Sequence, residues 1–192
     1  MGINPLKPRR AVFLDRDGVL NRVFLHADGK THPPATPAEM EILPGVKEAC
    51  QALHRAGYLR IVVTNQPDVA RGTQTREVVE AINDVLRGQI LVDEIFVCYH
   101  DDNDKCDCRK PKPGLLLEAA YKFGIILTDS FLIGDRWSDI VAGQRAGCKT
   151  ILLAGAASET HRVKPDFYTA SIKEAAEWIL RAEWSAVEGS MF

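Results

Sequence analysis

The sequence predicts an α/β protein whose parallel sheet is covered by helices on both faces. Short apolar runs typical of buried strands alternate with longer segments in which apolar residues recur at helical spacing. That alternation favours parallel strands joined by helical crossovers. Polar residues follow four of the apolar runs, and in an open α/β sheet ligands bind beyond the carboxyl ends of the strands.

Five strands and five helices are predicted, in strict alternation. Pro44 and Pro113 stand where a first helical turn begins, and Gly57 and Gly124 follow the last turns, which is the usual placement of these residues. The strands are expected to cover residues 10–14, 59–63, 94–99, 130–134 and 149–153. The helices are expected to cover residues 44–56, 75–88, 113–124, 136–146 and 171–182.

The whole chain is expected to form a single domain. Its 192 residues, 46% of them apolar and 26% charged, fit one soluble globular unit. We expect a core over residues 10–182, a tail over 183–192 and no large cap domain. Residues 26–41 are rich in Pro and His without a clear period, and a loop or hairpin over the first strand is expected there.

Charge and hydropathy exclude several classes of partner. The net charge of −2 provides no general attraction to nucleic acid. The longest apolar runs are far shorter than the roughly 20 residues of a membrane span. Residues 1–10 carry positive charge but lack the apolar segment of a secretory signal. We therefore expect a cytoplasmic protein without nucleic-acid or membrane partners. A monomer is also expected.

The first polar cluster is Asp15-Arg16-Asp17-Gly18, directly after the first strand. Residues two apart in extended chain point the same way, so two carboxylates can face one site, one as nucleophile or metal ligand and one as acid or base. A plain turn is the alternative. A calcium-binding EF-hand loop fails, because it needs Glu at its twelfth position, where His26 stands.

Two further clusters follow later strands. The hydroxyl and backbone N–H groups of Thr64-Asn65-Gln66 suit phosphate oxygens, although a polar loop is the simpler alternative. Asp135, after the fourth strand, can complete a magnesium site made of carboxylates and substrate phosphate; its alternative role is a helix cap. Asp139, one helical turn later, can orient a neighbouring side chain.

Taken together, the clusters resemble the four motifs of the haloacid dehalogenase (HAD) superfamily in order and spacing, over roughly residues 10–155. The matching segments are Asp15-x-Asp17-Gly-Val, Val63-Thr64-Asn65-Gln66, Arg109-Lys110-Pro111 and Gly134-Asp135-x-x-x-Asp139. The resemblance implies a Rossmann-like fold and a Mg²⁺-dependent phosphatase.

Specific roles follow from this resemblance. Asp15 would be the nucleophile, and Asp17 would protonate the leaving oxygen and then activate water. Thr64 and Lys110 would hold the phosphoryl group. Asp15, the backbone carbonyl of Asp17, and Asp135 would bind Mg²⁺. A carboxylate nucleophile divides one difficult displacement into two easier steps, and the cations offset its repulsion from phosphate.

A separate cluster contains three thiols and one imidazole. Cys98, His100, Cys106 and Cys108 form a full Cys₃His set for structural zinc. The single-residue spacing within each pair is tighter than in common zinc fingers, and a reduced polar loop with incidental cysteines is the alternative.

This cluster, followed at once by Arg109-Lys110-Pro111-x-Pro113-Gly114, resembles the histidinol-phosphatase-like branch of the superfamily. The resemblance implies that zinc fixes the loop presenting Arg109 and Lys110. It also implies that Arg109 and Arg136, together with Asn65 and Gln66, contact the substrate, a small phosphorylated metabolite. The first expectation is D-glycero-D-manno-heptose 1,7-bisphosphate, losing its 7-phosphate, and the alternative is histidinol phosphate.

One segment departs from the branch. Ser-Gly usually follows Asn-Gln, whereas Pro67-Asp68 stands here, and Asp68 can repel a second phosphate. Two rival functions stay open: a nucleic-acid 3′-end phosphatase, which uses a similar motif core, and a non-catalytic zinc-stabilised interaction module. The lack of a basic stripe disfavours the first, and four intact motifs disfavour the second.

Overall fold

The computed structural model describes residues 8–25, 29, 31–154 and 163–188, with side chains up to residue 181. Its centre is a six-stranded sheet in the order β5-β4-β1-β6-β7-β8, in which all neighbouring strands run parallel. The strands are β1 (Ala11–Leu14), β4 (Leu59–Asn65), β5 (Glu94–Cys98), β6 (Phe131–Gly134), β7 (Lys149–Leu153) and β8 (Phe167–Thr169). The predicted parallel sheet and its five strands are confirmed.

Strand β8 was not expected from the sequence. It has only three residues, and Tyr168 is exposed while Thr169 is buried. A segment this short at a sheet edge carries too few apolar positions to produce a strand pattern. Its place in the sheet depends on parallel pairing with β7, between Ile151 and Phe167 at one end and Leu153 and Thr169 at the other.

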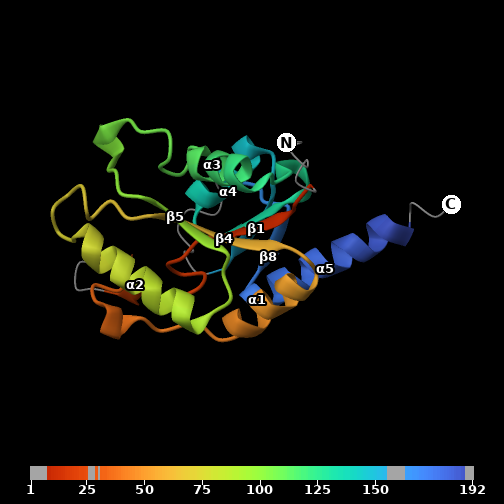
Figure 1. Cartoon of the computed structure of the whole chain (residues 1–192), viewed down its shortest axis with the longest axis horizontal. Coiled ribbons are helices and arrows are strands. Elements are labelled where there is room, and N and C mark those ends of the chain that lie inside the picture. Colours follow the sequence, from red (N-terminus) through yellow and green to blue (C-terminus); the bar gives the residue numbers. More distant parts are fainter. Residues whose placement is uncertain (1–7, 26–28, 30, 155–162, 189–192) are drawn as a thin grey trace, which may run out of the picture.

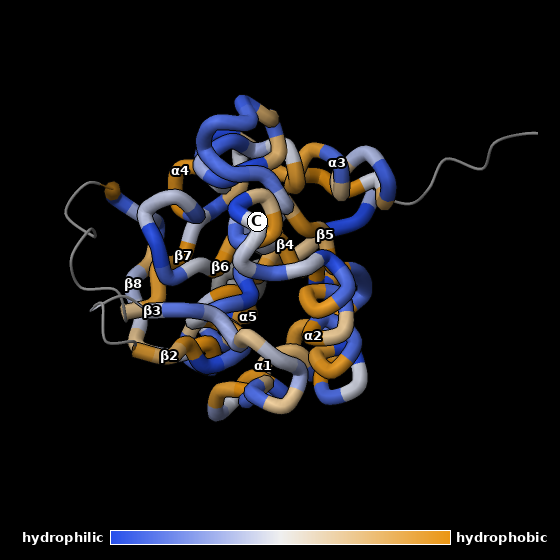
Figure 2. Tube along the Cα trace, turned by 90° about the vertical axis from the view of Figure 1, so that its left-hand side faces the viewer, coloured by the Kyte–Doolittle hydropathy of each residue, from blue (hydrophilic) through white to orange (hydrophobic). Residues whose placement is uncertain are grey.

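Helices cover both faces of the sheet. Helices α1 (Val46–Arg55), α2 (Arg76–Gln89) and α5 (Ile172–Glu188) lie on one side, and α3 (Gly114–Phe123) and α4 (Trp137–Ala146) on the other (Figure 1). Alternate residues of β1 serve the two faces: Val12 and Leu14 pack with the first group, and Ala11 and Phe13 with the second. Along α1 and α2 apolar residues are interspersed with polar ones (Figure 2), as expected of helices with one buried face.

Helix α5 is longer than predicted. It continues to Glu188 instead of ending at Ala182, because no Pro or Gly interrupts the sequence before Gly189. The expected tail is therefore partly helical, and its last residues, 189–192, lie outside the described residues. Trp178 anchors α5 by stacking on Phe167, with ring centroids 5.0 Å apart.

The segment before α1 contains a short hairpin, one of the two forms expected for it. Strands β2 (Phe24–Leu25) and β3 (Thr31–His32) pair antiparallel, and their connection at 26–28 and 30 lies outside the described residues. Three short 3₁₀ helices complete the fold: η1 (Pro37–Glu39), η2 (Asp102–Asp104) and η3 (Leu127–Asp129). In the described part of the chain, none of the helices has the length and apolar character of a membrane span.

Candidate active site

The predicted site residues come together at the carboxyl ends of the central strands. Asp15 follows β1, Thr64 lies just before β4 ends at Asn65, Asp135 follows β6, and Lys110 reaches in from the segment after β5. A pocket of about 520 Å³ opens here. The hairpin contributes part of its wall through Thr31, His32 and Pro33.

Lys110 lies at the floor of this pocket. Its buried ammonium group contacts Asp15 Oδ1 at 2.6 Å, Asp139 Oδ1 at 2.7 Å and the Val63 carbonyl at 2.8 Å. Burial alone would lower the pKa of Lys110, but Asp139 and Asp15 raise it above its ordinary value. The lysine is therefore a fixed cation beside the expected nucleophile.

Asp139 orients this lysine, in line with the expectation that it would orient a neighbour. Its Oδ2 accepts from the Arg136 backbone N–H at 3.0 Å, while its Oδ1 faces Lys110. Both oxygens are engaged, so Asp139 positions the lysine while staying attached to the start of α4.

Asp135 offers a ligand atom, its buried Oδ1, that makes no hydrogen bond to any of the described residues. The chain at Gly18 passes so close that a Cβ there would lie 2.2 Å from Asp135 Oδ2, and Gly18 has a φ of +91°. Ligand oxygens of Asp15, Asp135 and Asp139 all lie within 4.8 Å of one another. A buried carboxylate oxygen without a hydrogen bond, in such a cluster, fits a Mg²⁺ ligand.

The balance of charge also fits a divalent cation. Four aspartates surround two buried cations, Lys110 and Arg16, at this end of the sheet: Asp15, Asp17, Asp135 and Asp139. Burial raises the pKa of Asp15 to about 6, and burial together with the charges of Asp15 and Asp139 raises that of Asp135 to about 8. Without a metal, the site therefore favours protonation of these two carboxyl groups.

Asp17 lies in a different electrostatic setting, although only one residue separates it from Asp15. Arg16 donates to both of its oxygens, Asn21 donates to Oδ1 at 3.0 Å, and Gln66 donates to Oδ2 at 2.7 Å. Burial opposes ionisation, but Arg16 and these hydrogen bonds hold the pKa of Asp17 below its ordinary value. Two neighbouring carboxyl groups thus have pKa values shifted in opposite directions.

Asn65 and Gln66 line the pocket, but their amide groups are bonded to the protein. Asn65 donates to the Lys110 carbonyl and accepts from the Lys110 N–H, both at 3.1 Å. The Gln66 amide nitrogen donates to Asp17 and to Thr64 Oγ1 at 2.8 Å. These contacts position the expected catalytic groups, and the direct contacts of Asn65 and Gln66 with substrate stay a prediction.

The two predicted substrate arginines line the pocket at different depths. Arg109 is mostly buried and donates from Nε to Asp102 at 2.7 Å, and its buried Nη1 has no partner among the described residues. Arg136 is half exposed, and its Nε lies 4.0 Å from Asp135. Both can therefore reach a ligand in the pocket.

Further charges gather at the rim, over the segment that departs from the branch pattern. Arg71 bonds Asp101 at 2.6 and 3.0 Å and Asp68 at 3.3 Å. Asp101 also lies 3.9 Å from Arg109. The carboxylates of Asp68, Asp101 and Asp102 thus offset the positive charges of Arg71 and Arg109.

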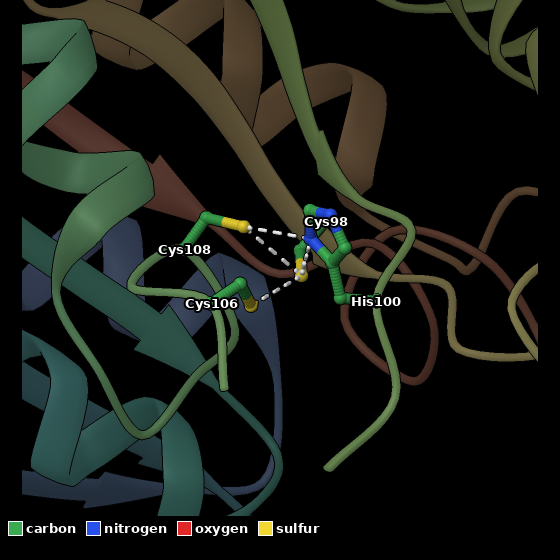
Figure 3. A group of neighbouring side chains, drawn as sticks. All are labelled: Cys98, His100, Cys106 and Cys108. Carbon is green, nitrogen blue, oxygen red and sulfur yellow. Dashed lines mark hydrogen bonds between the residues drawn. The ribbon is translucent and has the colours of Figure 1, made fainter. Parts of the chain in front are cut away.

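The side chains of the four predicted zinc ligands point toward one another (Figure 3). Cys98 Sγ lies 3.8 Å from Cys106 Sγ and 3.3 Å from Cys108 Sγ, and His100 Nδ1 lies 3.3 Å from Cys108 Sγ. Zn–S bonds of about 2.3 Å put the sulfurs of a tetrahedral site about 3.8 Å apart. The donor set and its spacing therefore fit zinc.

Sequence reasoning missed Asn21 and Asn83 and gave no role to Arg16. Asn83 lies on the buried face of α2 with Val79, Ile82 and Leu86. A polar residue within an apolar helical stripe usually has a buried partner, and that signal was available in the sequence.

Comparison with known proteins agrees with this geometry. A family model for HAD-hydrolase-like proteins matches residues 107–175. The D-glycero-beta-D-manno-heptose-1,7-bisphosphate 7-phosphatase of Helicobacter pylori strain J99 is 35% identical over 150 residues, which cover 75% of this chain and 82% of the relative. The enzyme of the same name from Yersinia pestis is 31% identical over 188 residues, 90% of each chain.

Solved structures agree as well. The D,D-heptose 1,7-bisphosphate phosphatase of B. bronchiseptica, crystallised with magnesium and phosphate, is 30% identical and has a TM-score of 0.78, covering 90% of this chain and 99% of that one. A putative HAD-like phosphatase from Mesorhizobium loti is 29% identical with a TM-score of 0.74. The resemblance inferred from the four motifs is therefore confirmed, and the chain belongs to the HAD-like hydrolase family, among its phosphatases.

Proposed function

We propose that this protein is a Mg²⁺-dependent phosphatase that acts through a phosphoryl group carried on Asp15. The observation that carries the proposal is that Asp15 and Lys110 line a 520 Å³ pocket and Asp135 lies beside Asp15, with ligand oxygens within 4.8 Å of one another. The cluster unites a carboxylate nucleophile, a fixed cation and an oxygen that has no hydrogen bond among the described residues and can bind a metal. Uncatalysed hydrolysis of phosphate monoesters is extremely slow, so no single acid–base pair is sufficient.

In the first step, an Asp15 oxygen attacks phosphorus and the ester P–O bond breaks, while Asp17 gives a proton to the departing oxygen. In the second step, Asp17 takes a proton from water, which attacks the same phosphorus and releases phosphate and Asp15. Lys110 and Thr64 hold the phosphoryl oxygens. A Mg²⁺ ion bound by Asp15, Asp135 and the Asp17 carbonyl would offset the repulsion between carboxylate and phosphate.

The proposed substrate is D-glycero-D-manno-heptose 1,7-bisphosphate, which loses its 7-phosphate. Relatives of about 35% identity that carry this name support it, as does the pocket, whose size suits a small phosphorylated sugar. Arg109, with an unpartnered buried Nη1, and the half-exposed Arg136 are proposed to bind the polar groups of the substrate.

The test is phosphate release from a panel of substrates with and without Mg²⁺. We expect the heptose bisphosphate to be the best substrate, ahead of histidinol phosphate, and release to require Mg²⁺. The Asp15→Asn variant is expected to lose activity by at least about 10⁴-fold, because covalent catalysis is removed. Asp84→Asn, an exposed aspartate on α2, is the matched control. Wild-type turnover in Asp15→Asn would reject the mechanism. A better substrate elsewhere in the panel would reject only the assignment of heptose 1,7-bisphosphate as the substrate.

A further inference from the structure

Arg16 is an arginine without exposure to solvent at the base of the active site. Its Nε donates to Asp17 Oδ1 at 3.1 Å and its Nη2 to Asp17 Oδ2 at 3.0 Å. Two parallel bonds of this kind fix both the place and the orientation of a carboxylate.

The guanidinium is in turn held by helix α2. Its Nη1 donates to Asn83 Oδ1 at 2.9 Å, and Asn83 is fully buried on the apolar face of α2. This contact joins the catalytic loop after β1 to a helix 67 residues later in the chain. The position of Asp17 is thereby tied to the packing of α2 on the sheet.

Stability alone does not explain such an arrangement. Taking a guanidinium and a carboxylate out of water costs several kcal/mol per ion, and a well-packed apolar replacement of a buried ion pair is often neutral or stabilising. A buried amide is costly where it lacks hydrogen bonds, and Asn83 Nδ2 has no partner among the described residues. Here the amide and the guanidinium serve to hold one carboxylate at the wall of the pocket.

We propose that Arg16 is a positioning residue that fixes the Asp17 carboxylate for proton transfer, with Asn83 holding Arg16 from α2. The proposal rests on the function proposed above. Without Arg16, Asp17 keeps one hydrogen bond on each oxygen, from Asn21 and Gln66, and its carboxylate is held less firmly. Both proton transfers then slow, whereas a step that needs no proton does not.

The test compares two leaving groups in the Arg16→Met variant. A sugar phosphate releases an alkoxide that needs a proton, whereas p-nitrophenyl phosphate releases a stable phenolate without one. With the sugar phosphate we expect single-turnover cleavage about 10–100-fold slower than in wild type, part of the 10²–10⁴-fold that acid–base catalysis supplies. With p-nitrophenyl phosphate we expect a fast burst of about one phenolate per enzyme, then slow turnover, because release of phosphate from Asp15 still needs Asp17.

Arg60→Met is the matched control. Arg60 is also a buried arginine, paired with Asp93 at 2.9 Å, but it lies near the start of β4, away from the pocket. Its substitution is expected to leave both rate constants unchanged. Arg16→Lys keeps one cationic donor and is expected to recover part of the loss. If Arg16→Met does not fold, Asn83→Leu provides the same comparison with a smaller expected effect.

A purely structural role predicts something else. Equal slowing with both leaving groups and no burst, or unchanged kinetics with lowered thermal stability, would overturn the positioning role. These outcomes are distinct from failure of the proposed function, in which Asp15→Asn stays active and no variant shows a burst.

Discussion

At the residue scale, the site places Asp15 and Asp17 in opposite environments. Burial raises the pKa of Asp15 to about 6, whereas Arg16 and hydrogen bonds lower that of Asp17 against the effect of burial. Titratable neighbours whose environments separate their pKa values commonly divide chemical roles between them. Here the division matches two roles: a nucleophile, Asp15, that needs a metal, and a base, Asp17, that is ionised in the free site and must gain a proton before it acts as the acid of the first step.

The charge of Asp68 is expected to tune substrate choice. Asp68 and Asp101 offset Arg71 at the rim, so the outer pocket attracts a second phosphate less strongly than Arg71 alone would. Asp68→Asn should raise kcat/KM for heptose 1,7-bisphosphate relative to heptose 7-phosphate by about 3-fold, the scale of one exposed charge. The two substrates differ only in that phosphate. Asp84→Asn is the control, and a constant or falling ratio would contradict the assignment.

The roles of individual residues were only partly predictable. Asp15, Lys110 and Asp135 could be located because motif residues after parallel strands meet at one edge of the sheet. The bonding of Asn65 and Gln66 could not, because it depends on which neighbour lies within 3 Å, and that is set by chain packing. The buried position of Arg16 could not be predicted either, since a charged residue between two aspartates suggests an exposed turn.

At the element scale, the loop between β5 and α3 connects the cysteine cluster to the pocket. Arg109 directly follows Cys108, and Asn65 clamps the next residue, Lys110, by its backbone. A zinc ion at the cluster, which we propose as structural, would fix the cluster end of this connection, while Asn65 holds Lys110 at the pocket end. Loss of the ion should therefore affect catalysis without any direct contact with substrate.

Cys106→Ala tests this connection. We expect one equivalent of zinc in the wild-type protein and none in the variant, with a lower melting temperature and kcat/KM reduced at least about 10-fold. Metal analysis, thermal unfolding and kinetics measure these changes. Cys148→Ala, which removes a buried thiol outside the cluster, is the control. A zinc-free wild-type protein of normal stability would reject the structural metal.

Secondary structure was predictable where the segments were long and were bounded by Pro and Gly. Helices with Pro before them and Gly after them, such as α3, were found close to their observed ends. Strand β8 is too short for a pattern, and the end of α5 lacked a stop signal until Gly189. Strand β8 lies at the edge of the sheet opposite β5, where its pairing with β7 decides its structure.

At the scale of the whole molecule, the acidic site should make metal-free stability depend on pH. The folded pKa values of Asp15 and Asp135, about 6 and about 8, lie above the ordinary 3.8. Between about pH 4 and pH 8 the folded state therefore binds more protons than the unfolded state, and the free energy of unfolding falls as pH rises. Mg²⁺ binds the ionised carboxylates, so its stabilising effect should increase over the same range.

Thermal unfolding at about pH 5 and pH 8, with and without Mg²⁺, measures this dependence. We expect a larger gain in melting temperature from Mg²⁺ at the higher pH, and a weaker pH dependence of the metal-free protein in Asp135→Asn. A metal-free protein that becomes more stable from pH 5 to pH 8 would show that the two carboxyl groups are ionised in the free site.

The central claim is that Asp15 carries the phosphoryl group, and reductive trapping tests it most directly. Borohydride added during turnover converts a phosphorylated aspartate to homoserine, which peptide mass spectrometry locates in the chain. We predict homoserine at position 15 in the wild-type protein with Mg²⁺ and sugar phosphate, and none without substrate or in Asp15→Asn. Phosphate release at full rate with no modified residue, or with the modification at another aspartate, would contradict the claim.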